Sequence, residues 1–170
     1  MHVKFIANYD KSKTALLQID DAKITFRNFR GLGDMYNQEG NRNFHVIIPD
    51  EETADALEAD VNEFGVGWKI KKKDLGEGQV RITMPVKVKY TERSQPKVYL
   101  ISGNNRLELN EGTIGMLDDI QIRSVDLDIR PYDGDGFRGP HRTAYLQSIY
   151  VVQEVDRFAA RFAEEEYPEE

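Results

Sequence analysis

Arginines and aromatic residues are interspersed between residues 27 and 42 of the 170-residue chain. Five of them are candidates for contacts with a ligand: Arg27, Phe29, Arg30, Tyr36 and Arg42. Cationic side chains bind phosphate groups and aromatic rings stack on unpaired bases, so this combination is typical of a surface that binds one strand of nucleic acid. The alternative interpretation is structural, because a phenylalanine on a strand can equally pack in a core.

A second basic stretch follows between Lys69 and Lys97, where nine lysines and arginines outnumber three acids. From this region we expect Lys71, Lys87, Lys89 and the preceding Trp68 to contact nucleic acid, and from a later loop Phe137 and Arg138. The alternative is an ordinary solvated strand surface, because lysines also protect the edges of sheets from pairing.

Patterns for catalysis and metal binding are weak. The chain has no cysteine and its three histidines are far apart, which argues against a zinc site. Asp126, Asp128, Asp133 and Asp135 could bind the divalent cation of a nuclease, which stays open as an alternative. However, the residues after Asp133 lack the bidentate acid that completes a calcium loop. We therefore expect no catalytic residue, no metal ligand and no cofactor, and no enzymatic activity.

Two strands joined by a long loop are expected to position the first group of residues. Residues 23–29 alternate as a strand does, the loop 30–41 contains three glycines, and residues 42–48 return as a strand before Pro49. The alternation predicts two faces, with Ile24, Phe26 and Asn28 on one and Lys23, Thr25, Arg27 and Phe29 on the other.

The remaining elements are expected to alternate between strands and two or three short helices. Asp50 is a suitable cap for a helix over about residues 50–64, and Asp20-Asp21 indicates a bulge in a first strand that begins near residue 14. The other predicted segments are strands at 66–73, 79–90, 97–101, 120–132 and 143–155, a helical turn within 110–119, a loop at 133–142 and a helix at 156–166. Pro85 predicts a bulge or an edge position inside its strand.

This order of elements predicts a mainly β (β-rich α+β) fold. It fits a five-stranded Greek-key barrel of the oligonucleotide/oligosaccharide-binding (OB) type, with the inserted helix near 50–64 and a C-terminal helix. In that fold the loops after the first and fourth strands flank the binding face, and here these would be 30–42 and 133–142. We expect one such domain over residues 1–163 and an acidic tail over 164–170.

Charge is unevenly distributed along the chain. The formal net charge is −7, yet the segment 69–97 is basic, whereas residues 154–170 contain seven acids and two arginines. This asymmetry indicates a basic working surface and an acidic tail that recruits partner proteins or competes for the basic groove. No stretch approaches the roughly 20 apolar residues of a membrane helix, and the N-terminus lacks the apolar run of a signal peptide.

The pattern of five segments resembles small proteins encoded beside replication and recombination genes of bacteriophages and prophages. These segments are ITFRNF (24–29), GNRNF (40–44), VYLISG (98–103), IRSVDLDIRPY (122–132) and AYLQ (144–147). Several proteins of this kind look like single-stranded DNA-binding proteins with an OB fold. The acidic end is similar to the tails of cellular single-strand binders, but it ends in Pro168-Glu169-Glu170 without their terminal Pro-Phe.

The resemblance implies a phage protein that binds single-stranded DNA without sequence specificity and protects or organises it during replication or recombination. It also implies the cytoplasm of the bacterial host as the location, and replication or recombination proteins as partners of the tail. A homo-oligomer is compatible with this function, and no membrane contact is expected. The alternative is a protein-interaction module of a phage replication or anti-defence system, which would use exposed sheet edges.

Overall fold

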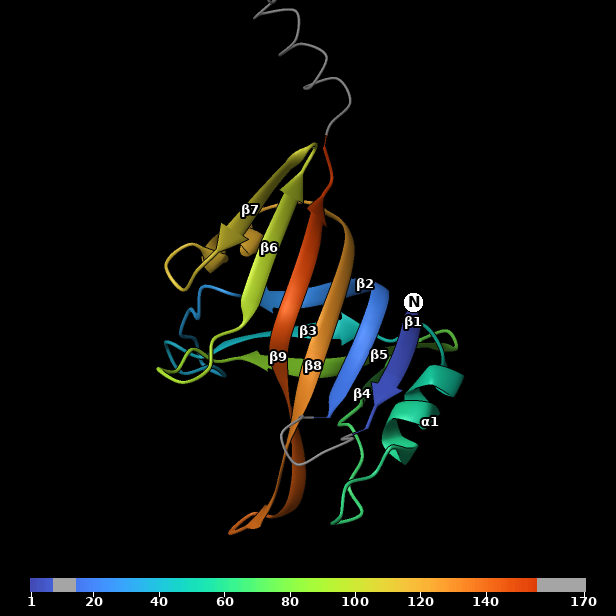
Figure 1. Cartoon of the computed structure of the whole chain (residues 1–170). Coiled ribbons are helices and arrows are strands. Elements are labelled where there is room, and N and C mark those ends of the chain that lie inside the picture. The colour runs from blue at the N-terminus through green and yellow to red at the C-terminus, as the bar shows by residue number, and fades with distance from the viewer. Residues whose placement is uncertain (8–14, 156–170) are drawn as a thin grey trace, which may run out of the picture.

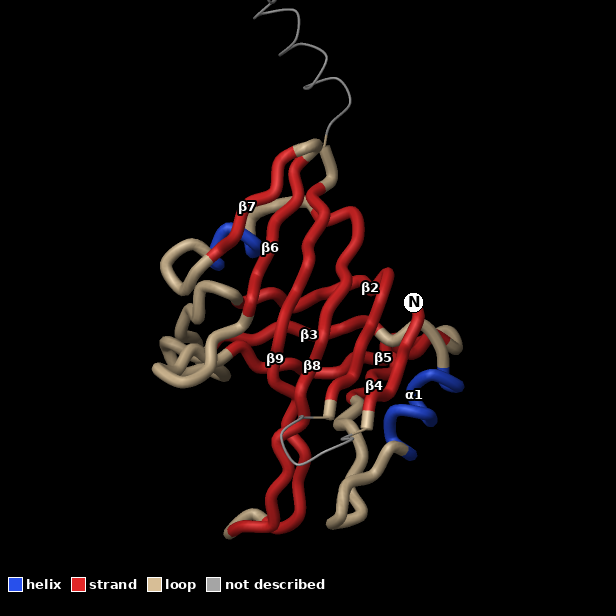
Figure 2. The backbone as a smooth tube through the Cα atoms, in the orientation of Figure 1, coloured by secondary structure: helices blue, strands red, loops and turns tan. Residues whose placement is uncertain are grey.

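The computed structural model describes residues 1–7 and 15–155. This part of the chain is mainly β, as predicted, and Figure 2 shows how little of it is helical. Its elements are β1 (His2–Ile6), β2 (Leu16–Asn28), β3 (Arg42–Ile47), α1 (Glu51–Ala59), β4 (Lys71–Gly76), β5 (Gln79–Val88), β6 (Lys97–Ser102), β7 (Asn105–Leu109), the 3-10 helix η1 (Ile114–Asp118), β8 (Ile122–Gly136) and β9 (Gly139–Gln153).

All nine of these strands belong to one sheet, with the order β4-β5-β3-β2-β8-β9-β6-β7 and with β1 paired to β2. β5 also pairs with β9 in parallel, where Lys87 is the register partner of Tyr145. Pairings therefore lead from β2 through β3, β5, β9 and β8 back to β2. Figure 1 shows β8 and β9 crossing β3 and β5, with α1 at one side of the molecule.

The hydrophobic core lies between these crossing strands. The fully buried side chains include Leu17 and Ile19 of β2, Phe44 and Val46 of β3, Met84 and Val86 of β5, Ile129 of β8 and Ile149 of β9. Along β3, and along β5 apart from the buried Thr83, the buried residues alternate with exposed or half-buried ones, which is the period of a strand with one face in a core. Apart from Thr83, the side chains on the opposite face of these strands are at least partly exposed.

Two irregular positions bend β2. Asp21 and Phe26 both have left-handed backbone conformations, with φ values of 53° and 51°. The pairing register shifts beside each of them, between Ile19 and Ala22 and between Thr25 and Asn28. The first irregularity confirms the predicted bulge at Asp20-Asp21, whereas nothing in the sequence indicates the second. A bulge reverses the alternation of every later residue on its strand.

Several element boundaries differ from the prediction. Asp50 caps α1 as expected, through a 2.7 Å hydrogen bond from the Thr53 N–H, but the helix ends at Ala59 rather than near 64. Residues 133–142 do not form a loop, because β8 and β9 continue as a hairpin to the two-residue turn Phe137-Arg138. Residues 2–6, which precede the predicted first strand, form the separate strand β1.

The predicted C-terminal helix and acidic tail lie outside the described residues. Within the described part, no helix is long and apolar enough to span a membrane.

Candidate nucleic-acid interface

The outer face of β2, β3, β5 and β4 carries a cluster of cations. The register aligns Lys23, Ile47, Thr83 and Lys71 in one row across the four strands. The next register pair on this face joins Lys73 to Arg81. We call this surface the basic sheet face and define it by Lys23, Phe26, His45, Lys71, Lys73 and Arg81.

An aromatic cluster lies at the centre of the basic sheet face. Phe26 is 49% exposed, and its ring meets the His45 ring edge-on with 5.2 Å between centroids. The Arg81 guanidinium lies 4.7 Å from the centre of the Phe26 ring, close enough for a cation–π interaction. These three side chains come from three different strands, so the face combines a solvent-accessible ring with cations, as a single-strand surface requires.

His45 lies close to two positively charged side chains of this face, those of Lys71 and Arg81. Burial lowers the pKa of His45, and the positive charges of Lys71 and Arg81 lower it further. The ring is held by a 3.0 Å hydrogen bond between its Nδ1 and the Thr83 hydroxyl. A phosphate bound here would lie near two cations and near a histidine that becomes a third cation when its ring is protonated.

A second row of residues extends the face toward the β8–β9 hairpin. Lys87 has Asn43 of β3 on one side and Tyr145 of β9 on the other, and Tyr145 in turn pairs with Arg130. The Arg130 guanidinium lies 5.2 Å from the Tyr145 ring centre. Tyr132, an exposed residue of β8, meets the same ring edge-on at 6.0 Å. Rings and cations therefore continue from β5 onto the hairpin.

Two of the rings predicted to stack on bases are buried. Phe29 is 0% exposed and stacks on Phe44 in the core at 5.0 Å. Trp68 is 4% exposed, and its Nε1–H donates a 2.9 Å hydrogen bond to Asp60. Both predictions are wrong. For Phe29 the reason is the bulge at Phe26, which turns Phe26 outward and Phe29 inward, the reverse of the predicted faces.

The arginines near the β2–β3 loop are engaged within the protein. Arg27 donates 2.7 Å hydrogen bonds to the carbonyl groups of Leu117 and Ile120, and so holds η1 against β2. Arg30 pairs with Asp119, and this hydrogen bond raises the pKa of Arg30 and lowers that of Asp119. Their role in nucleic-acid contact stays a prediction, and for Arg27 the structure provides a structural role instead.

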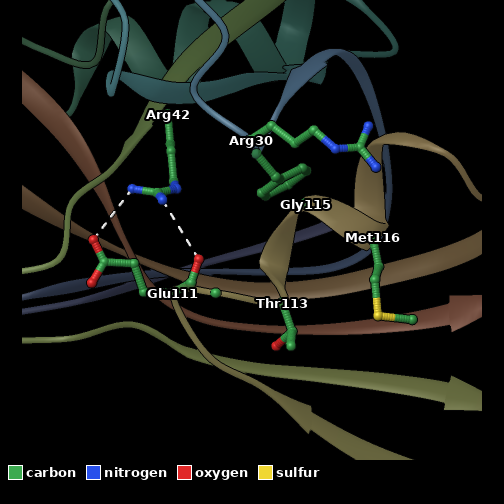
Figure 3. A pocket seen from close by; sticks show the side chains of 8 residues that line it. Arg30, Arg42, Glu111, Thr113, Gly115 and Met116 are labelled. Carbon is green, nitrogen blue, oxygen red and sulfur yellow. Dashed lines mark hydrogen bonds and ion pairs between the residues drawn. The ribbon is translucent and has the colours of Figure 1, made fainter.

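Arg42, the first residue of β3, points to the core side of the strand rather than onto the outer face. Its guanidinium lies 5.5 Å from the Tyr90 ring centre and 3.6 Å from the Glu111 carboxylate. Together with Arg30 it lines a pocket of about 460 Å³ between the β2–β3 loop and the segment that leads into η1. Figure 3 shows Arg42 and Glu111 facing each other across this pocket.

The remaining predicted residues are exposed. Lys71 is the first residue of β4, Lys87 lies in β5, and Lys89 comes directly after β5. Tyr36 lies in the β2–β3 loop, and Phe137 and Arg138 form the hairpin turn. In Figure 1 the tip of the hairpin is at the lower end of the molecule, away from the β2–β3 loop at the left. The two predicted loops therefore do not converge on one groove; the sheet face between them contains the cluster.

Sequence reasoning missed Phe26, His45, Tyr132 and Tyr145 as site residues. Alternation alone predicts the core face for Phe26, because its bulge has no signal in the residue types. Tyr132 could have been found, because it shares the polar face of its predicted strand with Arg130.

The aspartates considered for a metal site have other partners. Asp133 accepts hydrogen bonds from Arg142 and Asn62, and Asp126 accepts one from the Asp21 N–H. Among residues 1–7 and 15–155 no group of three acids or histidines could hold a metal ion.

Solved structures with a similar fold are single-stranded DNA-binding proteins. One, the "single-stranded DNA-binding protein from bacteriophage Enc34 in complex with ssDNA", is 14% identical, with a TM-score of 0.50 over 91% of this chain and 98% of that chain. The same phage protein without DNA is 13% identical, with a TM-score of 0.50 over 91% of this chain and 93% of that one. At this identity the likeness concerns the fold alone.

The family described as "Putative phage ssDNA-binding domain" matches residues 7–170. The chain belongs to this family, as the resemblance noted in its sequence predicts. None of the curated proteins matches the chain.

Proposed function

We propose that this protein binds single-stranded DNA across the basic sheet face, largely independently of base sequence, and protects or organises the strand during phage replication or recombination. The observation that carries the proposal is the cluster of Phe26, His45 and Arg81 among the lysines of β2, β4 and β5. Family membership supports the same function.

We also propose that β2, β3, β5, β9 and β8 form an OB-type barrel. The circuit of pairings among these strands supports it, including the parallel contact between β5 and β9. In an OB barrel the second and third strands carry the oligonucleotide face. These would be β3 and β5, the strands of His45 and Arg81.

Each group on the face has a distinct task. Lys23, Lys71, Lys73 and Lys87 neutralise phosphates, a contribution that does not depend on base identity. The exposed part of the Phe26 ring stacks on a base, while Arg81 covers the other part and reaches a phosphate. Tyr132 and Tyr145 stack on bases further along the strand. None of these tasks requires a metal, a cofactor or catalysis.

The wider expectations belong to the same proposal. The protein acts in the cytoplasm of the bacterial host as one domain over residues 1–163, with or without self-association. The acidic residues 164–170 bind replication or recombination proteins, or compete for the basic sheet face.

Fluorescence anisotropy of a labelled 15-residue dT oligonucleotide, dT15, tests the proposal, with a duplex of the same length as the comparison. We expect preference for the single strand and an affinity that falls with salt, with a slope of about 0.7 per phosphate neutralised. Absence of binding even at low salt would refute the proposal and leave the protein-interaction module as the better interpretation.

A further inference from the structure

β7 forms an open edge of the sheet. It pairs with β6 on one side, and because the strand order ends at β7, no described strand pairs with its other side. Figure 1 shows β7 at the outer edge of the molecule, beside β6. The first four of its five residues, Asn105, Arg106, Leu107 and Glu108, are exposed. Such an edge offers unpaired backbone N–H and C=O groups to another strand.

The other two strands that have a single neighbour carry features that hinder further pairing. β4, at the opposite end of the strand order, has three successive lysines and a register irregularity between Asp74 and Gly76. β1 has Lys4 at its centre. Lysines and bulges are common means by which edge strands avoid a partner. β7 has neither lysine nor proline, and its register with β6 is regular over all five residues, so its edge is open to a partner.

The turn between β6 and β7 fixes which backbone groups point to the open edge. Gly103 has a φ of 59° at the first central position of this two-residue turn, the place where a type II′ hairpin requires glycine. The turn closes with a hydrogen-bonded pair, Ser102 and Asn105, and bonded and non-bonded pairs then alternate along the strands. The odd-numbered residues of β7 therefore direct their N–H and C=O groups to β6. Arg106 and Glu108 direct theirs to the open edge.

The side chains of Arg106 and Glu108 are complementary to those of a second copy. Neither has an ion-pair partner among the described residues. Both lie on the outer face, where the Arg106 guanidinium is 4.1 Å from the Tyr99 ring centre and Glu108 is the register partner of Tyr99. When two β7 strands pair antiparallel with Leu107 opposite Leu107, each Arg106 lies directly opposite the Glu108 of the other copy. Opposite charges in this position stabilise a strand pair.

The neighbouring registers of such a pair are unfavourable. The outward backbone groups must face each other, and the two nearest registers that allow this place Arg106 opposite Arg106 or Glu108 opposite Glu108. Like charges directly opposite destabilise a pair. Leu107 is 50% exposed on the face of its buried register partner Leu100, and its counterpart covers it only in the favoured register. Charge, backbone and apolar contact therefore select the same two-fold arrangement.

We propose that a second copy of this chain occupies the open edge, so that two β7 strands pair antiparallel about a two-fold axis at Leu107. The inference does not rest on the proposed function. No residue that defines the basic sheet face belongs to β6 or β7, so each copy keeps its own face. Because only a five-residue edge is shared, the dimer is weak and reversible, with an expected dissociation constant of about 10–100 µM.

Sedimentation velocity of the full chain without DNA, over about 5–500 µM protein, measures this equilibrium. Arg106→Glu and Glu108→Arg, made singly, put like charges opposite each other and should weaken the dimer at least about tenfold. The double variant restores opposite charges in the same register and should return the dissociation constant to within about threefold of the original. Glu108→Pro removes an outward N–H that the dimer needs and β6 does not, so it should also abolish the dimer.

Lys4→Glu provides the matched control, because it reverses an exposed charge on another edge strand and should leave the dissociation constant unchanged. A thermal melt verifies that every variant folds. The inference would be overturned by a protein that stays monomeric at about 500 µM. A double variant no better than the single variants, or a dimer weakened by Lys4→Glu, would overturn it as well. None of these results bears on the binding of dT15, so the proposed function is tested separately.

Discussion

Phe26 occupies an unusual backbone conformation for a residue of its size. Its φ of 51° lies in the left-handed region, which costs a bulky residue about 1–2 kcal/mol. The same bulge places the ring on the outer face, beside His45 and Arg81. Strained positions are often found at functional sites, so the conformation of Phe26 is consistent with a role in binding.

Replacement of Phe26 should separate binding from stability. Phe26→Ala should weaken binding to dT15 about tenfold, because a stacked base contributes about 1–3 kcal/mol. The melting temperature should change little, because about half of the ring is already exposed. Anisotropy and a thermal melt measure the two effects. Phe5→Ala on β1, where the ring is similarly exposed, should leave the affinity unchanged; an equal loss in both variants would contradict the assignment.

His45 should make binding depend on pH. Burial, Lys71 and Arg81 lower its pKa below the usual value of about 6.5, so protonation is easier in the unfolded state. The stability that the neutral ring contributes is therefore fully present above about pH 6.5 and declines as the pH falls below it. Bound phosphate has the opposite effect on the ring and favours its protonation.

We therefore expect binding to dT15 to take up a proton and to strengthen between about pH 7 and pH 5. NMR titration of the His45 ring, with and without dT15, measures the shift, and anisotropy at the two pH values measures the affinity. His45→Gln should reduce the pH dependence. A pKa of His45 that does not rise on addition of dT15 would show that the strand does not approach this ring.

At the scale of elements, interactions between distant segments hold the strands that carry the face. Arg27 joins β2 to η1 through two carbonyl groups, which explains why a cation on the predicted outer face is half-buried.

Pro85 is tolerated in β5 because the pairing with β4 ends at Thr83 and the contact with β9 occurs at Lys87. Its missing N–H therefore falls where the strand has no neighbour on that side, as an edge position requires.

The base of the β8–β9 hairpin is held by one buried arginine. The Arg142 side chain is 8% exposed, donates to Asp133 at 2.8 Å and to the Asp60 carbonyl at 2.7 Å, and lies 4.8 Å from the centre of the Trp68 ring. Arg142→Ala should lower the free energy of unfolding by about 2–4 kcal/mol, because the carboxylates of Asp133 and Asp60, which lie 2.8 Å and 3.5 Å from the guanidinium, lose their cation. Urea unfolding measures this, and Arg123→Ala, an exposed change on β8, should cost less than about 0.5 kcal/mol. Similar losses in both variants would contradict the anchoring role.

At the scale of the whole molecule, the contact between β5 and β9 joins the basic sheet face to the hairpin. Without it, Lys87 and Tyr145 would belong to separate surfaces.

Neighbouring lysines of β4 lie on opposite faces of the sheet and have different roles. Lys71 and Lys73 share the face of Thr83 and Arg81, whereas Lys72 lies on the other side and pairs with Glu51 of α1 at 2.8 Å.

The salt dependence of binding should distinguish these lysines. The double substitution Lys71→Gln and Lys73→Gln should reduce the slope of log affinity against log salt by about 1.4, from about 0.7 per phosphate contact. Lys72→Gln should leave the slope unchanged, although the variant loses its ion pair with α1. A smaller slope for Lys72→Gln than for the double variant would place the strand on the opposite face.

The sequence by itself determined the class of fold and the kind of surface. Alternating apolar residues on β3 and β5, the cap at Asp50 and the bulge at Asp20-Asp21 are local signals, so the mainly β fold and the basic strands could be predicted. The combination of cations and rings also indicated a single-strand binder, in agreement with the family to which the chain belongs.

Only the tertiary structure decided which residues form the face. The bulge at Phe26 exchanges the positions of Phe26 and Phe29, because one extra residue reverses the two-residue period of a strand. Trp68 and Arg27 are drawn inward by partners at Asp60, Leu117 and Ile120. Tyr145 reaches Lys87 through a pairing between strands more than fifty residues apart. Such long-range contacts leave no periodic trace in the residues near either partner, so a reading of local pattern cannot find them.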